Sequence, residues 1–402
     1  MTGLDNMYAS KRPMRIEHVQ ASWVCFPIAT DQQHRSDFGQ IDRFDTAILR
    51  IQTECGRVGW GEAKNAAGSS GNYSALVHLI NSEIAPLLVG REPRDITSIW
   101  GQLYNGSRHK EASSRGHCMP QLARRGLTIA AMSAVDIALW DILGKSLDVP
   151  LWLLLGGRKA DRLPAYGSGG WASASTIGDE LLGYVQTKGF RAVKMRVGVM
   201  DGTPHRSAVR VKAARERLGP DVDLMCDAHG TFNVADARRF CHLIRDCNLA
   251  WLEEPVSADD KAGMAEVRQA ASVPIAAGES EGTRFDFRDL IEHRAVDILQ
   301  PDLAVCGGIT EAIAIAELAA TYNLAFVPHL WAGAPSFFAG LHLCAAASAG
   351  TLVEYPMGAN PMLHDLIEEP VQVLDGHISI PDRPGLGFTI RQQVLAAHTV
   401  GV

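Results

Sequence analysis

Three acidic residues recur at matching positions of a repeating pattern. Asp227, Glu253 and Glu279 lie near the ends of the short apolar segments VDLMCDA, LAWLEEP and VPIAAGE, at equal intervals of 26 residues. Three converging carboxylates would repel one another and raise their own pKa values unless a cation neutralised them. Oxygen ligands suit a hard divalent ion, so the pattern predicts a Mg²⁺ site, with Mn²⁺ also possible. The alternative for each acid alone is a helix cap or a solvated side chain.

Basic residues accompany these acids. Lys194 and Arg196 are one residue apart in the segment RAVKMRV, so on a strand both side chains point the same way. His229 follows Asp227 by two residues and is expected to share its direction for the same reason. The alternative role for His229 is to orient Asp227.

A second acid–base pair lies further along the chain. Asp302 ends the segment VDILQPD, and His329 lies near the end of the next apolar segment, LAFVPHL. An aspartate on a neighbouring strand fixes the tautomer of a histidine and raises its basicity, which is what a general base needs. A lone histidine is more often structural, so the interpretation of His329 as a base depends on its pairing with Asp302. Glu354 ends the last such segment, GTLVEYP.

The elements that must position these residues are eight apolar segments at intervals of roughly 25–30 residues, with amphipathic helical segments between them. A strand–helix unit repeated eight times is typical of a (β/α)₈ barrel, in which the carboxyl ends of the strands form one catalytic face. A doubly wound sheet is the alternative, but no glycine-rich dinucleotide loop follows the first strands. The expected strands are 163–169, 191–197, 222–228, 249–255, 273–279, 296–302, 324–330 and 350–356.

The pattern of apolar and polar residues differs on both sides of this repeat. Residues 14–63 predict a β-meander with a tight turn near Cys55 and Gly56, and helical spacing follows over 74–105 and 121–147. The last segment, HISIPDRPGLGFTI, is expected to return to the N-terminal part. The expected division is a smaller N-terminal domain over 1–135, a barrel over 136–360 and a segment over 361–402 that returns to the N-terminal domain.

Composition limits the classes of function. The 402 residues are 47% hydrophobic and 21% charged, with a net charge of −7, which argues against a nucleic-acid partner. No run of about 18 apolar residues or signal-peptide pattern is seen, so neither a membrane partner nor export is expected. The first 14 residues are expected to form a loose tail. Eight scattered cysteines without a C-x-x-C pair suit a reducing cytoplasm and give no zinc signature.

At these residues the sequence resembles the enolase superfamily, in its mandelate racemase and muconate lactonizing enzyme branch. CDAHG, WLEEP and AGES resemble its three metal-ligand strand ends, QPDLAVCGGIT and VPHLW its Asp–His dyad, and VEYP its eighth-strand glutamate. The segment AAMSAVDIALWDILGKSLDVPLWLLLGG resembles the helix that leads into its barrel. The resemblance implies a (β/α)₇β TIM-like barrel with an α+β capping domain formed from the N-terminal segment and the C-terminal tail. It also implies that a substrate carboxylate binds Mg²⁺ while a base removes the proton from the adjacent carbon.

Two departures from the family pattern guide the choice of reaction. Racemases of the family usually carry K-x-K on the second strand, whereas Arg196 stands at the second position here and is a poor base. His329 is then the expected base, and Lys194 and Arg196 hold the carboxylate and the enediolate. Asp-x-His at 227–229 resembles acid-sugar dehydratases, in which this histidine protonates the leaving hydroxyl.

The sequence thus favours an acid-sugar dehydratase, a lyase acting on aldonates or aldarates to give a 2-keto-3-deoxy sugar acid. The first alternative is a sugar-lactone cycloisomerase, since PHLWAG resembles a segment of such enzymes, and a racemase or epimerase is the next. A non-catalytic carboxylate-binding relative would be expected to lack metal ligands or the base, and here all are present.

Substrate choice is expected to depend on two early loops, 28–40 and 65–73. His34 and Arg35 in the first loop, with Trp331 on the seventh strand, are the candidate substrate contacts; a solvated loop is the alternative. Four small residues, at positions 68–71, give the second loop the mobility a lid needs. The polar segment 105–126 has no assigned role. A homo-oligomer is expected from the resemblance alone.

Overall fold

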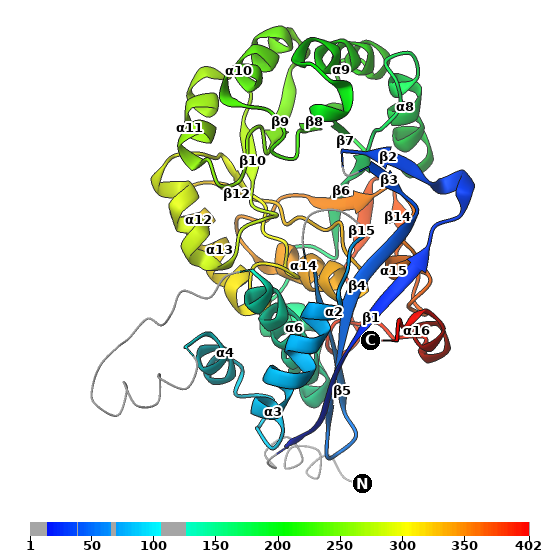
Figure 1. The fold of residues 1–402 in the computed structure, drawn as a ribbon, viewed down its shortest axis with the longest axis vertical. Coiled ribbons are helices and arrows are strands. Elements are labelled where there is room, and N and C mark those ends of the chain that lie inside the picture. Colours follow the sequence, from blue (N-terminus) through cyan, green and yellow to red (C-terminus); the bar gives the residue numbers. More distant parts are fainter. Residues whose placement is uncertain (1–13, 38, 66–69, 106–125, 402) are drawn as a thin grey trace.

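The computed structural model describes residues 14–37, 39–65, 70–105 and 126–401. A ring of helices surrounds a set of parallel strands, and a separate antiparallel sheet with its own helices packs below them (Figure 1). Residues 1–13 of the predicted loose tail lie outside the described residues, and its last residue, Met14, is buried.

The N-terminal sheet has the order β1-β4-β5, with every pair antiparallel. The predicted tight turn is confirmed: Gly56 has a φ of 79° between β4 and β5, a left-handed conformation that favours glycine. Strands and helices of this part are β1 (Ile16–Pro27), β4 (Arg43–Thr53), β5 (Val58–Ala63), α2 (Ser74–Leu79), η2 (Ile80–Ile84), α3 (Ala85–Leu88) and α4 (Ile96–Asn105).

The long helix α6 (Leu127–Leu147) joins this sheet to the barrel. It has the length and apolar content of a membrane span, but 78% of its most apolar window is buried within the protein. Gly59 and Gly61 of β5 allow it to approach closely, because a Cβ on either residue would meet the α6 backbone. α6 is therefore a core helix whose face is covered by β5.

The barrel strands follow one another in sequence order from β6 to β12, each parallel to the next, and β13 pairs with β6. A parallel bridge from Phe326 to Gly350 joins β12 to the segment that leads into β13 and closes the ring. Each predicted strand overlaps one observed strand: β6 (Arg162–Gly169), β7 (Ala192–Arg196), β8 (Asp223–Asp227), β9 (Leu249–Glu253), β10 (Ile275–Ala277), β11 (Ile298–Leu299), β12 (Ala325–Phe326) and β13 (Val353–Pro356).

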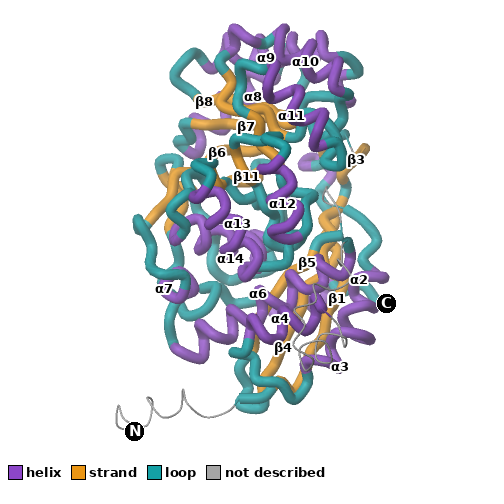
Figure 2. Tube along the Cα trace, turned by 90° about the vertical axis from the view of Figure 1, so that its left-hand side faces the viewer, coloured by secondary structure: helices purple, strands orange, loops and turns teal. Residues whose placement is uncertain are grey.

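Amphipathic helices connect these strands and cover the outside of the barrel, as the tube view also shows (Figure 2). The (β/α)₇β barrel with an α+β cap is therefore confirmed. The barrel helices are α7 (Leu151–Leu154), α8 (Ile177–Lys188), α9 (Pro204–Leu218), α10 (Val234–Leu243), α11 (Lys261–Ala270), α12 (Thr283–Glu292), α13 (Ile309–Thr321) and α14 (Ala334–Ala346), with α15 (Pro361–His364) after β13.

The C-terminal segment has two attachments. The hairpin of β14 (Val373–Leu374) and β15 (His377–Ser379) pairs with β6, and α16 (Gln392–His398) returns to β1, where His398 stacks on Phe26 at 3.9 Å. The predicted segment HISIPDRPGLGFTI thus begins on the barrel strand β6, and the contact with the N-terminal sheet is made by α16, which follows it. The domain boundaries remain a prediction; the first of them falls inside α6.

Candidate active site

Three neighbouring strands end in charged side chains at one level of the barrel. The register places Arg196 of β7 beside Asp227 of β8, and Asp227 beside Glu253 of β9. Glu279 follows β10 by two residues. All four side chains are at least nine-tenths buried, so the strand ends bring the predicted residues into one enclosed site.

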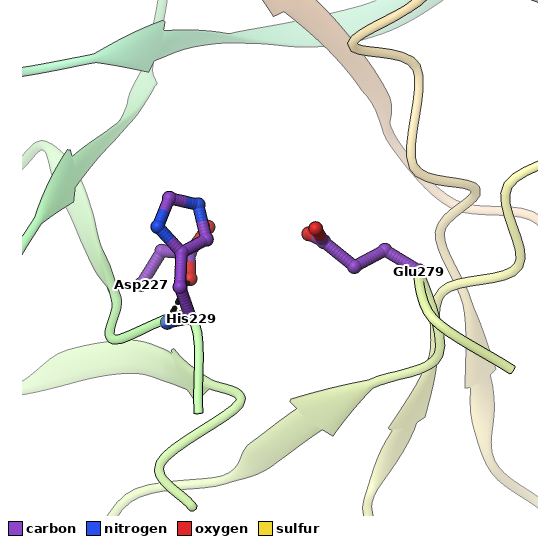
Figure 3. A group of neighbouring side chains, drawn as sticks. All are labelled: Asp227, His229 and Glu279. Atoms are coloured by element: carbon purple, nitrogen blue, oxygen red, sulfur yellow. Dashed lines mark hydrogen bonds and ion pairs between the residues drawn. The ribbon is translucent and has the colours of Figure 1, made fainter. Parts of the chain in front are cut away.

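Asp227, His229 and Glu279 offer ligand atoms that lie within 4.8 Å of one another, and their side chains face a common space (Figure 3). This group differs from the predicted trio because His229 is present and Glu253 is not. Both Glu253 oxygens instead lie 2.7 Å from Lys194 Nζ, and Oε2 also accepts from Gln300 Nε2 at 2.8 Å.

Lys194 joins the predicted metal ligands to Glu354. Its Nζ lies 3.6 Å from Asp227 Oδ2 and 3.1 Å from Glu354 Oε1, besides its bonds to Glu253. Burial alone would lower the pKa of Lys194, but the carboxylates of Glu253 and Glu354 outweigh it and raise the pKa. Lys194 is therefore a cation held among the carboxylates of the site.

The chemistry of Glu279 fits a metal ion. Its Oε2 is buried and accepts no hydrogen bond from any residue that the structure describes, although His329 Nε2 lies 3.4 Å away. Burial would raise the pKa of Glu279, but His329 and His229 outweigh it and lower the pKa, which favours the ionised form. A buried anion needs a positive partner, which a divalent ion would supply.

The predicted dyad is formed. His329 Nδ1 lies 2.9 Å from Asp302 Oδ2, and a parallel bridge joins the two residues. Burial would raise the pKa of Asp302, but Lys64 and His329 lower it to about 2, so the carboxylate accepts from the imidazole. Burial lowers the pKa of His329, yet Glu279 and Glu354 outweigh it and raise the pKa. With Nδ1 donating, Nε2 is left to take a proton.

His229 reaches the site by a different route from the one expected. β8 ends at Asp227, and His229 has a left-handed φ of 46°, so strand alternation does not set its direction. Its backbone N–H donates to Asp227 Oδ1 at 2.9 Å, its Nδ1 lies 2.8 Å from Asp37 Oδ2, and its Nε2 lies 3.4 Å from Asp227 Oδ2. Burial and the Arg196 guanidinium lower the pKa of His229.

An aromatic wall borders the cations. The Arg196 guanidinium lies 5.7 Å from the Trp331 ring centroid, and Trp331 meets Trp171 edge-on at 5.7 Å. His34 covers Trp171 at 3.9 Å, and burial with the charge of Arg196 lowers the pKa of His34 to about 4. His34 is thus a neutral part of the wall.

The hairpin of β2 (His34–Ser36) and β3 (Gly39–Ile41) brings His34 to the barrel mouth (Figure 1). The next residue, Arg35, is exposed, as alternation along a strand requires. Residues 66–69 of the second predicted loop and 106–125 of the unassigned segment lie outside the described residues.

Sequence reasoning missed several residues of the site. Lys64 bonds Asp302, Gln300 bonds Glu253, and Asp37 bonds His229. Lys64 directly follows the apolar strand VGWGEA, the same signal that marked Asp227, and was open to detection. Asp37 lies 192 residues from His229 and carries no local signal. A cavity of about 610 Å³ opens beside His229 and Glu254, large enough for a small ligand.

Comparisons with known proteins agree with this geometry. The chain is 32% identical to the D-galactarolactone cycloisomerase of Agrobacterium fabrum, over 89% of this chain and 92% of that protein. It is also 32% identical to the arabinonate dehydratase of Saccharolobus solfataricus, over 88% and 90%. A crystal structure of a racemase from Streptomyces coelicolor A3(2) with bound magnesium is 28% identical, with a TM-score of 0.82 over 96% and 100% of the two chains.

Two family models cover most of the chain. Residues 24–156 match the N-terminal domain of mandelate racemase and muconate lactonizing enzyme, and residues 176–394 match the enolase C-terminal domain-like family. Enzymes of the enolase superfamily bind a divalent metal ion, and the carboxylates described above provide a possible site for one. The chain therefore belongs to the mandelate racemase and muconate lactonizing enzyme branch of the enolase superfamily.

Proposed function

We propose that the enzyme is a metal-dependent acid-sugar dehydratase that converts an aldonate or aldarate to a 2-keto-3-deoxy sugar acid. One observation carries this reaction: two imidazoles, His329 and His229, approach the Glu279 carboxylate, and each is held by its own aspartate. One ring removes a proton while the other donates one, which is the pairing that elimination of water requires.

His329 is the base in this reaction. Its Nε2 takes the proton from the carbon next to the substrate carboxylate, and Asp302 stabilises the imidazolium through Nδ1. The electron pair of the broken C–H bond moves onto the carboxylate as an enediolate. In this proposal the buried cations Lys194 and Arg196 lower the energy of the enediolate.

His229 is the acid. As the enediolate collapses, the bond from the β-carbon to its hydroxyl breaks, and the hydroxyl leaves as water with the proton from His229. The enol that remains becomes the 2-keto-3-deoxy acid by tautomerisation. Asp37 orients the ring of His229 through Nδ1.

The proposed metal is Mg²⁺, with Mn²⁺ as a substitute, held by Asp227, Glu253 and Glu279. The bound magnesium of the Streptomyces coelicolor relative supports this choice. The ion would supply Lewis-acid stabilisation of the substrate carboxylate. We also expect a cytoplasmic homo-oligomer, which light scattering coupled to gel filtration would test.

A sugar-lactone cycloisomerase is the second candidate, because a relative of 32% identity has that activity. Both reactions begin with removal of the same proton by one base. Racemisation needs a second base on the opposite face, and Arg196 is a poor one.

Proton NMR in D₂O with Mg²⁺, on a panel of mono- and diacid sugars and their lactones, separates these reactions. Loss of the α-proton with a new deoxy-methylene signal indicates dehydration. Ring opening or closure without loss of water indicates the cycloisomerase. Exchange with inversion and no other product would indicate a racemase.

His229→Asn tests the role of the acid. We expect dehydration to fall by about 10²-fold or more while α-proton exchange continues, because only the second step uses this residue. In the wild type, α-proton exchange should rise with pH as His329, whose pKa is raised, loses its proton. Full dehydration by the variant would assign His229 to orienting Asp227 instead.

A further inference from the structure

Lys64 is a buried cation at the end of β5, in the capping domain. Its side chain is 3% exposed, and its Nζ donates to Asp302 Oδ2 and to the Trp331 carbonyl, both at 2.9 Å. Asp302 Oδ2 is also the oxygen that holds His329 Nδ1. A single carboxylate oxygen of Asp302 thus accepts one hydrogen bond from Lys64 of the cap and one from His329 of the barrel.

Strand β5 makes a second contact with the chain segment that follows His329. Glu62 accepts from the backbone N–H groups of Gly333 at 2.8 Å and Ser336 at 3.2 Å, at the start of α14. A carboxylate at a helix N-terminus is a stabilising partner. Glu62 and Lys64, which we call the β5 clamp, therefore hold the segment 331–336 at two points, and this segment begins two residues after His329.

We propose that Lys64 is a positioning residue for the catalytic base: it acts through Asp302 and the Trp331 carbonyl to hold His329 in the orientation that removes the α-proton. This role rests on the proposed function in so far as His329 is the base. It makes the capping domain a contributor to the chemistry of the barrel.

The geometry explains why a cation is needed at this point. Asp302 is fully buried, and its Oδ1 is already held by the backbone N–H of Ala304 at 2.8 Å. Without Lys64, Oδ2 would keep only the imidazole as a partner, and the buried charge would lack a fixed counter-ion. The carboxylate would then be free to tilt, and a displacement of the ring by about 1 Å can cost a reaction 10²-fold.

Lys145 provides a matched control. Its Nζ bonds a buried carboxylate oxygen, Asp141 Oδ2, at 2.6 Å and a carbonyl oxygen, that of Val58, at 3.0 Å. It thus makes the same pair of contacts as Lys64 between α6 and the other end of β5, away from the dyad. Lys145→Met should lower the melting temperature and leave kcat unchanged.

The test compares Lys64→Met with Lys145→Met in the α-proton exchange assay. We expect Lys64→Met to lower kcat about 10²-fold with KM within about threefold, since substrate binding does not use this residue. In an Asp302→Asn background, Lys64→Met should lower kcat less than about threefold. The reason is that both substitutions affect the base through the same carboxylate. An unchanged kcat, or the full cost persisting without Asp302, would overturn the proposal.

The α-proton exchange assay tests the role of Lys64 independently of whether the reaction is a dehydration. Exchange precedes both dehydration and cycloisomerisation, so a wrong product leaves the comparison intact. If no acid of the panel exchanged its α-proton, the proposed function would fail. Crystal structures of the two variants would then decide: a displaced Asp302 and His329 in Lys64→Met supports positioning, and an unmoved pair refutes it.

Discussion

At the scale of single residues, Glu279 is where the proposed acid, the proposed base and the candidate metal site meet. Its carboxylate lies 3.4 Å from His329 and is part of the group with Asp227 and His229. Such a buried, ionised side chain is costly unless a cation neutralises it. The stability of the protein should therefore depend on the metal.

Adding Mg²⁺ at about 100 times its dissociation constant should stabilise the folded state by about 2.7 kcal/mol and raise the melting temperature by several degrees. Differential scanning fluorimetry with EDTA and with Mg²⁺ or Mn²⁺ measures this shift. Glu279→Gln should lose most of it, whereas Glu216→Gln, at an exposed position on α9, should retain it. Equal shifts in the two variants would argue against Glu279 as a ligand.

Local sequence patterns identify a site residue when the strand itself carries it to the site. Asp227, Glu253, Lys194 and Arg196 were predictable in this way, since the ends of parallel barrel strands meet at one face. The contact of Lys64 with Asp302 spans 238 residues and depends on how the cap docks. No periodicity within one segment reports such a contact.

At the scale of elements, the packing of β5 on α6 sets where the β5 clamp lies. Gly61 faces the α6 backbone at Ala134, and a Cβ there would overlap the carbonyl group. The strand pattern was predictable, but this close approach depends on which helix covers the strand. The two glycines of β5 are thus a requirement of packing rather than of turn formation.

Gly61→Ala should destabilise the protein by about 3 kcal/mol, because two backbones must separate. Gly183→Ala on α8 is the control, since no atom lies within 4 Å of a Cβ there. Alanine is the better helix former, so this variant should gain up to about 1 kcal/mol. Urea denaturation compares the two, and similar free energies of unfolding would contradict the packing argument.

His342 on α14 makes the stability of the fold depend on pH. It is fully buried, its Nδ1 accepts from the backbone N–H of Trp152 at 3.3 Å, and its Nε2 faces the Leu386 carbonyl at 3.2 Å. Burial lowers its pKa to about 4. Because the folded value lies below the unfolded value of about 6.5, the unfolded chain binds the extra proton first, and stability is lost as pH falls through this window.

His342→Gln keeps one donor and one acceptor but cannot titrate in this range. Its melting temperature should fall less than that of the wild type between about pH 6.5 and 4. Thermal melts across this range give the two slopes. If the melting temperatures of both proteins fell equally with pH, His342 would not be the cause of the loss of stability in acid.

At the scale of the whole molecule, the cap and the barrel share their interior. Val24, Phe44 and Trp60 of the cap sheet belong to the same buried cluster as the barrel strands, and Trp140 of α6 packs against both this cluster and the cap core. The repeat spacing predicted the barrel, and the family resemblance predicted the cap. The shared core depends on side chains distant in sequence, which neither signal contains.

Because of this shared core, we expect unfolding in urea to be a single cooperative transition. Far-UV circular dichroism should report the helices of both parts, and tryptophan fluorescence should report the eight tryptophans, which are likewise found in both parts. The two midpoints should agree to within about 0.2 M. A separate early transition in either signal would show that the cap and the barrel unfold independently.

The left-handed backbone of His229 also limits how the enzyme can be evolved in the laboratory. A φ of 46° is tolerated by glycine, asparagine and aspartate, and strongly disfavours valine, isoleucine and threonine. In a saturation library at this codon, the β-branched members should be less stable by about 1–3 kcal/mol before any selection for activity. Substitutions of His229 that change the reaction are therefore expected to involve only a few residue types.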